Sequence, residues 1–151
     1  MKAEVMTGWV KATGYAIAIH RATHGALKRK GIAKEMSYKE RSEKIKEFNA
    51  WLLEAMQKHN IHRADVVKIY FEVEGDEKNF EILKNTVKVF VARPIGIIEG
   101  EDFKEVSEEE FEDIYYSLVE KVTGEKKKPK KREDKNGKLD VFLKKEDVEE
   151  V

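Results

Sequence analysis

The stretch "VVKIYFEVE" at residues 66–74, together with "FEILKNTVKVFVA" at 80–92, decides the fold. Hydrophobic and polar side chains alternate along the first segment, which is the pattern of a strand with one face in the core. The second segment returns after the loop "GDEKN" and ends before Pro94, so we predict an antiparallel hairpin. One face carries Val67, Ile69, Phe71 and Val73 with Val87, Val89 and Val91; the other carries Lys68, Tyr70, Glu72 and Glu74 with Thr86, Lys88, Phe90 and Ala92.

Two Ser-x-x-Glu sequences predict the starts of helices. "SYKE" at 37–40 opens a helix that runs to about His59, and "SEEE" at 107–110 opens one that ends at Gly124. Nearer the N-terminus, residues 5–19 are rich in β-branched and aromatic types, so we expect one or two strands, the second at Tyr15–Ile19. A helix from about Arg21 to Lys30 would follow. The predicted class is α+β, an antiparallel sheet with helices packed on one face and a charged C-terminal extension.

The composition divides the chain into three parts. Residues 1–124 form the predicted α+β domain. Residues 125–138, "EKKKPKKREDKNGK", contain no apolar side chain and read as a solvated basic linker. Residues 139–151 regain Leu139, Val141, Phe142 and Leu143, and are too short to fold alone. We expect them to dock on their own domain or on a neighbouring subunit.

The composition and the distribution of charge limit the possible environment and partners of the protein. Charged residues make up 40% of the chain and there is one glutamine, a bias typical of hyperthermophile proteins. The absence of cysteine excludes disulfides and thiolate zinc sites. No apolar run is long enough for a membrane span, so we expect a cytoplasmic protein. Residues 1–63 carry a net charge of +7 although the whole chain is neutral, and a local basic surface can attract polyanions.

The polar face of the predicted hairpin is the leading candidate site. It carries Tyr70 and Phe90 beside Lys68 and Lys88. Aromatic faces bind unpaired bases by stacking, at about 1–3 kcal/mol per base, while lysines contact phosphates. The alternative is that a helix or another subunit covers this face and the rings form a second core.

Two other segments could extend such a site. Near the N-terminus Trp9, Lys11 and Tyr15 share one strand parity, so the rings could continue the stacking platform or form an ordinary aromatic core. Phosphate contacts could come from four further cations, unless they are simply solvated: Arg21, Lys28, Arg29 and Arg93.

Little in the sequence indicates a metal site or catalysis. The pairs His20/His24 and His59/His62 have the spacing of one helical turn, but no HExxH sequence is present. The carboxylates cluster in an acidic loop and at a helix start, where they complement the helix dipole. Phosphate-loop, dinucleotide and nucleophile-elbow motifs are absent from the sequence. We therefore expect a non-enzyme without a metal or cofactor.

The stretch "TGYAIAIHRATHGALKRK", Thr13–Lys30, resembles the archaeal ThermoDBP group of single-stranded DNA-binding proteins. The similarity extends over about Thr7–Gly124 in the order of a long helix, a hairpin and an acidic-capped helix. It implies non-specific binding of single strands in a cleft of aromatic and basic residues, and oligomers joined partly through C-terminal extensions. The opening motif is a Thr-Gly-Tyr sequence, a short run of small apolar residues and then a basic amphipathic segment, and Tyr15 and the basic residues after it match it. Residues 139–151 depart from a leucine-zipper extension because they hold no sustained heptads.

Two hypotheses follow for function. The first is a homo-oligomer, dimer or tetramer, that binds single-stranded DNA or RNA without sequence preference and without catalysis. Trp9, Tyr15, Tyr70 and Phe90 would stack on bases; Lys11, Arg21, Lys28, Arg29, Lys68, Lys88 and Arg93 would contact phosphates. The second is a structural or adaptor homo-oligomer whose aromatics form a subunit interface.

Overall fold

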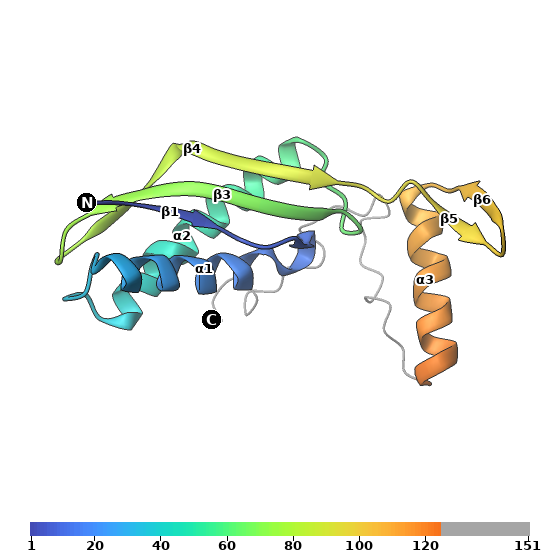
Figure 1. The fold of residues 1–151 in the computed structure, drawn as a ribbon, viewed down its shortest axis with the longest axis horizontal. Coiled ribbons are helices and arrows are strands. Elements are labelled where there is room, and N and C mark those ends of the chain that lie inside the picture. Colours follow the sequence, from blue (N-terminus) through green and yellow to red (C-terminus); the bar gives the residue numbers. More distant parts are fainter. Residues whose placement is uncertain (125–151) are drawn as a thin grey trace.

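The computed structural model describes residues 1–124 and has β3 (Val66–Gly75) at the centre of its main sheet. β4 (Phe80–Ala92) pairs antiparallel with one edge of β3, which confirms the predicted hairpin. β1 (Lys2–Met6) and the short β2 (Val10–Lys11) pair in succession with the other edge, both antiparallel (Figure 1). The architecture is α+β, as predicted.

Two helices cover one face of this sheet. α1 (Tyr15–Lys30) follows a single 3₁₀ turn, η1 (Ala12–Gly14), and ends at Gly31, whose φ of 69° suits glycine. α2 (Tyr38–Lys58) begins with the predicted capping box, in which the Ser37 side chain accepts from the backbone of Glu40 and the Glu40 side chain accepts from the backbone of Ser37. Both helices lie on the valine face of β3, below and behind the sheet in Figure 1.

The predicted strand at Tyr15–Ile19 is wrong, because these residues form the first turns of α1. The run "YAIAI" alternates as a strand does, and a short apolar run does not by itself distinguish a buried strand from a buried helix face. The buried positions of α1 continue at helical spacing through Ile19, Thr23 and Leu27. A helix places all of them against one face of the sheet, whereas a strand ending at Ile19 would not.

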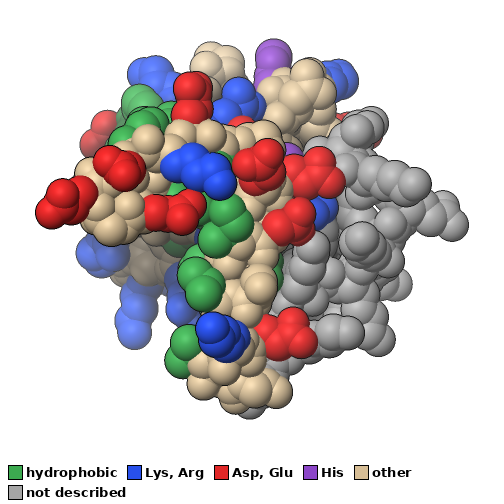
Figure 2. All heavy atoms as spheres, turned by 90° about the vertical axis from the view of Figure 1, so that its right-hand side faces the viewer, with side chains coloured by type: hydrophobic (Ala, Val, Ile, Leu, Met, Phe, Trp, Pro, Cys, Tyr) green, Lys and Arg blue, Asp and Glu red, His purple; other side chains and the backbone are tan. Residues whose placement is uncertain are grey.

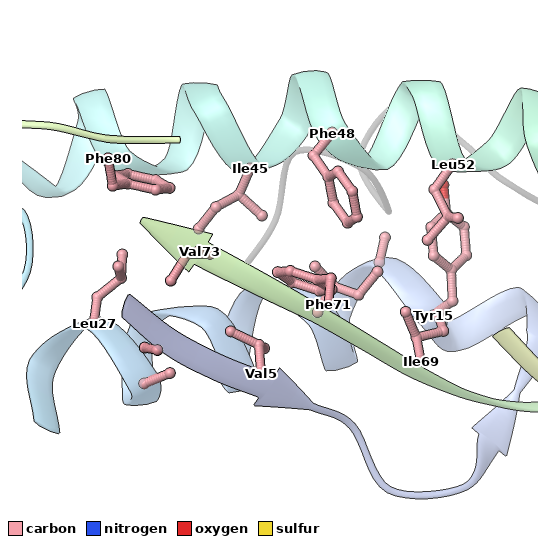
Figure 3. Packing of buried hydrophobic residues seen from close by; sticks show 14 of the residues in the cluster. Val5, Tyr15, Leu27, Ile45, Phe48, Leu52, Ile69, Phe71, Val73 and Phe80 are labelled. Atoms are coloured by element: carbon pink, nitrogen blue, oxygen red, sulfur yellow. The ribbon is translucent and has the colours of Figure 1, made fainter. Parts of the chain in front are cut away.

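The core lies between this helical layer and the valine face of the sheet (Figure 3). Phe71 of β3 is fully buried and its ring lies 4.7 Å from the ring of Phe48 on α2. Tyr15 of α1 is also fully buried, and its hydroxyl donates to the backbone carbonyl of Asn49 at 2.7 Å. The predicted division of the hairpin into a core face and a polar face is therefore correct for β3.

A third helix stands apart from the two-layer core. A small hairpin of β5 (Gly96–Glu99) and β6 (Asp102–Glu105), which the sequence analysis did not predict, leads into α3 (Glu108–Thr123). Ser107 caps α3 and Gly124 ends it, as the sequence indicated. Figure 1 shows α3 at one end of the sheet, running across the strand direction.

Ion pairs attach α3 to the end of the sheet. Arg63 pairs with the buried Glu112, and Arg93 pairs with both Asp65 and Glu108, at 3.1 and 3.3 Å. Burial, reinforced by the neighbouring Asp65 carboxylate, raises the pKa of Glu108 to about 7. The helix is thus tethered by polar contacts rather than by an apolar face.

The predicted basic linker (125–138) and docking segment (139–151) lie outside the described residues. Within residues 1–124, no helix is long and apolar enough to cross a membrane.

Candidate functional site

The polar face of the sheet, which we call the outer face, carries rings and lysines in two adjacent rows. The strand register places Met6 beside Tyr70 and Tyr70 beside Lys88, which gives the first row. In the second row Lys68 pairs with Phe90, and the Lys68 ammonium lies 6.0 Å from the centre of the Trp9 ring. Tyr70, Phe90, Lys68 and Lys88 were predicted to share this face, and the register shows that they do.

Two of the rings on the outer face, Trp9 and Phe90, are open to solvent, and Tyr70 is partly buried. Trp9 is 54% exposed and Phe90 is 45% exposed, so the described part of the chain does not bury them in a second core. The Lys88 ammonium lies 5.6 Å from the centre of the Tyr70 ring. Each lysine is therefore held beside an aromatic face, and both kinds of group are presented within one surface.

Acidic side chains mark one border of this surface. The Tyr70 hydroxyl donates to Glu4 at 2.8 Å and lies 3.3 Å from Glu72. The hydrogen bond to Glu4 is the main cause that raises the pKa of Tyr70 to about 12, so the phenol stays neutral. Glu74 and Glu81 pair across the hairpin further along. A polyanion would be repelled from that end and favoured at the end that holds Trp9 and Phe90.

Three of the predicted site residues have other partners in the structure. Tyr15 is fully buried in the core, and its ring is not available for stacking. Lys11 donates to the Tyr116 hydroxyl at 3.2 Å and lies over the rings of Tyr115 and Tyr116 on α3. Arg93 is engaged by Asp65 and Glu108. The predicted continuous platform from Trp9 to Tyr15 is therefore not formed, because Tyr15 begins a helix on the opposite face of the sheet.

The basic residues of α1 divide between two places. Arg21 and Lys28 are exposed seven residues apart, on the side of α1 that faces away from the sheet. Arg29 instead lines a hollow of about 230 Å³ at the β1 edge. That hollow also holds Lys2, Lys30 and the two border glutamates, Glu4 and Glu72. Arg21 and Lys28 are thus remote from the outer face, while Arg29 lies at its edge.

Sequence reasoning missed Met6, which is 50% exposed and stands in the first row beside Tyr70. Strand parity within "KAEVM" could have found it, since Val5 is the core-facing neighbour of Met6. Lys2 and Lys30 were also missed. Their approach to Arg29 depends on how the end of α1 packs beside β1, which has no signal in the sequence.

An apolar groove of about 420 Å³ lies on the opposite face of β4, against α2. Val87, Val89 and Val91 line it together with Trp51, whose ring lies 5.2 Å from the Lys84 ammonium. This groove presents a single, partly buried ring beside a lysine, whereas the outer face presents several rings and lysines within two strand rows. We therefore place the candidate site on the outer face.

Three of the four histidines make contacts within the fold. His20 and His24 both lie on α1 with ring centres 6.0 Å apart, and His24 stacks on Tyr38 at 4.8 Å. His62 lies at the junction with α3, 3.0 Å from Glu108. Among residues 1–124 no group of at least three His, Cys, Asp or Glu side chains is placed to hold a metal ion.

Replacing His24 by phenylalanine is expected to flatten the dependence of stability on pH between about 6.5 and 4. Burial, with His20 and Arg41 nearby, lowers the pKa of His24 from 6.5 to about 4. In that window the unfolded state binds the proton more readily, so folding loses stability as the pH falls. We expect the loss from this ring to be about 1–2 kcal/mol, because solvent reaches part of it and screens the effect. Urea unfolding of both proteins at pH 7.5, 6.5, 5.5 and 4.5 measures the difference, and parallel profiles would contradict the assignment.

Comparison with known proteins identifies the fold. No protein-family model matches the chain, and no curated protein matches its sequence. Among solved structures, pfuThermo-DBP-RP1 is similar with a TM-score of 0.51 and 20% identity, over 80% of this chain and 76% of that one. The structure of apeThermo-DBP-RP2 bound to ssDNA dT10 is similar with a TM-score of 0.53 and 23% identity. That match covers 82% of this chain and about half, 52%, of the other.

The fold is therefore shared with solved ThermoDBP-related structures, as the resemblance at residues 13–30 implied. At these identities the likeness concerns the arrangement of the backbone. The argument for function rests on the side chains of the outer face.

Proposed function

We propose that this protein binds single-stranded nucleic acid without sequence preference, through the outer face and without catalysis. The observation that carries the proposal is the placing of rings and lysines side by side on the outer face: Trp9, Lys68 and Phe90 lie in one row, and Tyr70 and Lys88 lie beside the exposed Met6 in the next. A ring offers a stacking surface to any base, and a lysine beside it reaches the phosphate that links that base to the next.

The acidic border limits where a strand can lie. Glu4 and Glu72 hold the Tyr70 hydroxyl at one side, so bases would stack mainly on Trp9 and Phe90, with Tyr70 at the margin. Arg29, Lys2 and Lys30 add positive charge at the β1 edge, but they share their hollow with Glu4 and Glu72, which offset part of it. Arg21, Lys28, Lys11 and Arg93 are left out of the proposed site because their positions or partners separate them from the outer face. The protein of the same fold that is bound to ssDNA dT10 supports single strands as the ligand class.

The test is equilibrium binding of labelled poly-dT, poly-U and duplex DNA to the full chain. We expect both single strands to bind in about 50 mM salt, duplex to bind more weakly, and affinity to fall steeply as salt rises. A salt concentration of about 50 mM favours phosphate contacts, so the proposal is contradicted if neither single strand binds there. Preference between poly-dT and poly-U defines which nucleic acid is the ligand.

A double variant, Lys68→Ala with Lys88→Ala, is expected to reduce the salt dependence. Each phosphate contact on a single strand contributes about 0.7 to the slope of log affinity against log salt, so loss of both lysines should lower its magnitude by about 1.4. The matched control is Lys39→Ala, an exposed lysine at the start of α2. An unchanged slope in the double variant would place the phosphate contacts elsewhere.

The rival hypothesis, in which the same aromatics form a subunit interface, predicts a different outcome. The molar mass of each variant in solution separates the two. Loss of nucleic-acid binding at constant mass supports the binding surface, whereas a fall in mass with the outer-face variants supports the interface.

A further inference from the structure

α3 is held against the end of the sheet chiefly by charged side chains. Within this helix, all of which the structure describes, the one buried residue is Glu112, and it pairs with Arg63. Leu118 and Val122 of the same helix are 54% and 81% exposed. Figure 2, which faces the end of the molecule that carries α3, shows hydrophobic side chains along the helix surface. The position of α3 therefore depends on the polar cluster beneath its first turns.

This cluster holds more acids than bases. Within residues 1–124 its charged groups come from three segments of the chain: Arg63 and Asp65 before β3, Arg93 after β4, and Glu108 and Glu112 on α3. Two guanidinium groups thus face three carboxyl groups, and the exposed Glu109 lies outside them. His62 adds no positive charge, because burial is the main cause that lowers its pKa. One negative charge is therefore unbalanced unless a carboxyl group holds a proton, which would make the cluster neutral and less costly to bury.

The contacts of the individual oxygen atoms indicate where that proton lies. Arg93 Nε is 3.1 Å from Asp65 Oδ2 and 3.3 Å from Glu108 Oε1, so one guanidinium group brings the two carboxyl groups together. Their other oxygens, Asp65 Oδ1 and Glu108 Oε2, are buried without a hydrogen-bond partner in the described part of the chain. Glu108 Oε2 lies 3.0 Å from His62 Nδ1, but that nitrogen accepts from the Ala64 N–H at 2.9 Å and offers no proton. A proton on one of the two carboxyl groups would satisfy both orphaned oxygens.

The proton belongs on Glu108 rather than on Asp65. Asp65 Oδ2 accepts from the backbone N–H of His62 at 2.8 Å as well as from Arg93, and both contacts favour the ionised form of Asp65. Burial, followed by the charge of Asp65 and a hydrogen bond with it, raises the pKa of Glu108 to about 7, although Arg93 acts in the opposite direction. The direction of the pKa shift thus agrees with the contacts.

We propose that Glu108 is held as a neutral carboxylic acid that shares its proton with Asp65, and that this proton holds α3 on the sheet. When α3 leaves the sheet, Glu108 returns to solvent and to its ordinary pKa of 4.5, so the docked helix binds the proton more tightly than the free helix. The stabilisation of docking is complete below about pH 4.5 and is lost as the pH rises through about 7. The arrangement does not use the outer face, so it stands or falls independently of the proposed nucleic-acid binding.

The first test is amide hydrogen exchange of the full chain at pH 6 and 8.5, with each rate divided by the intrinsic rate at that pH. We expect the protection of the α3 amides to fall by about tenfold between these pH values, since the docked helix loses its proton there. Amides of β3 open only with the whole sheet and should stay the more protected of the two. Protection of α3 that does not fall, or that equals that of β3, overturns the proposal.

Glu108→Gln separates the proton from the shape of the side chain. The amide keeps an oxygen for Arg93 and supplies a permanent N–H donor toward Asp65, so the protection of α3 should become independent of pH within about twofold. Glu110→Gln is the matched control, because it removes the same charge from an exposed position in the same turn and should keep the tenfold fall. A pH dependence that Glu108→Gln leaves intact contradicts the proposal.

The second test needs no variant. In the ¹³C-labelled full chain, the carboxyl resonance of Glu108 should titrate with a midpoint near 7 instead of 4.5. The carboxyl resonance of Asp65 should respond over the same pH range, because two groups that share a proton titrate as a pair. A midpoint for Glu108 below about 6 would show an ordinary ionised carboxylate and would overturn the proposal.

Discussion

Replacing Trp9 and Phe90 together by alanine is expected to weaken binding of single-stranded nucleic acid by about a hundredfold or more. Each ring stacked on a base contributes about 1–3 kcal/mol, and the two rings flank Lys68 on the outer face. Both rings are half exposed, so their loss should change the free energy of unfolding by less than about 1 kcal/mol. Fluorescence anisotropy with labelled dT oligonucleotides measures the affinity, and urea unfolding measures the stability.

Tyr38→Ala is the matched control for this prediction. Tyr38 is 51% exposed at the start of α2 and stacks on His24, away from the outer face. Its loss should leave the affinity within about twofold, since it removes an exposed ring without touching the site. Equal losses of affinity in the control and in the double variant would mean that the rings act through general stability, and the outer face would then not be the binding surface.

Arg93→Ala is expected to lower the free energy of unfolding by about 2–4 kcal/mol while leaving nucleic-acid affinity nearly unchanged. The carboxylate of Asp65 is fully buried, and the Arg93 guanidinium donates to it at 3.1 Å. Removing one partner of a buried ion pair leaves the other charge uncompensated, which costs about 3–5 kcal/mol. The expected loss is somewhat smaller because the Arg93 side chain is partly exposed.

The control for Arg93 is Lys104→Ala, which removes an exposed ion pair with Glu99 and should cost less than about 1 kcal/mol. Urea unfolding gives the stabilities, and binding is compared at a temperature where both variants are folded. A large fall in affinity with little change in stability would instead support Arg93 as a phosphate-contacting residue, as the sequence suggested. A fall in stability alone would show that Arg93 acts by joining the end of β4 to Asp65 and to Glu108 of α3.

Some of the candidate site could be predicted because the signal lies within single strands. In a strand, neighbouring side chains point to opposite faces, so the alternation at 66–74 assigned Tyr70 and Lys68 to the polar face before any pairing was known. The same rule assigned Lys88 and Phe90 on the returning strand. The strand register then placed Lys68 beside Phe90 and Tyr70 beside Lys88, as the hairpin prediction required.

The predictions for other positions were wrong because the local sequence pattern fits two structures. "YAIAI" suits a strand or a buried helix turn, and the packing of α1 against the valine face decides for the helix. That choice moves Tyr15 from a proposed ligand surface into the core. The small hairpin of β5 and β6 was missed because its strands are short, at four residues each, and mostly exposed, so they lack a buried face that would impose a pattern.

The sequence by itself therefore determined the hairpin, its two faces, the caps of α2 and α3, and the class of the fold. These depend on side-chain period and on contacts within one turn, both of which are local. Only the tertiary structure decided which cations share a surface, because Arg21, Lys11 and Arg93 are placed by helix packing and by ion pairs between distant segments. It also left the apolar side of α3 exposed, since polar contacts to Arg63 and Arg93 hold that helix against the sheet.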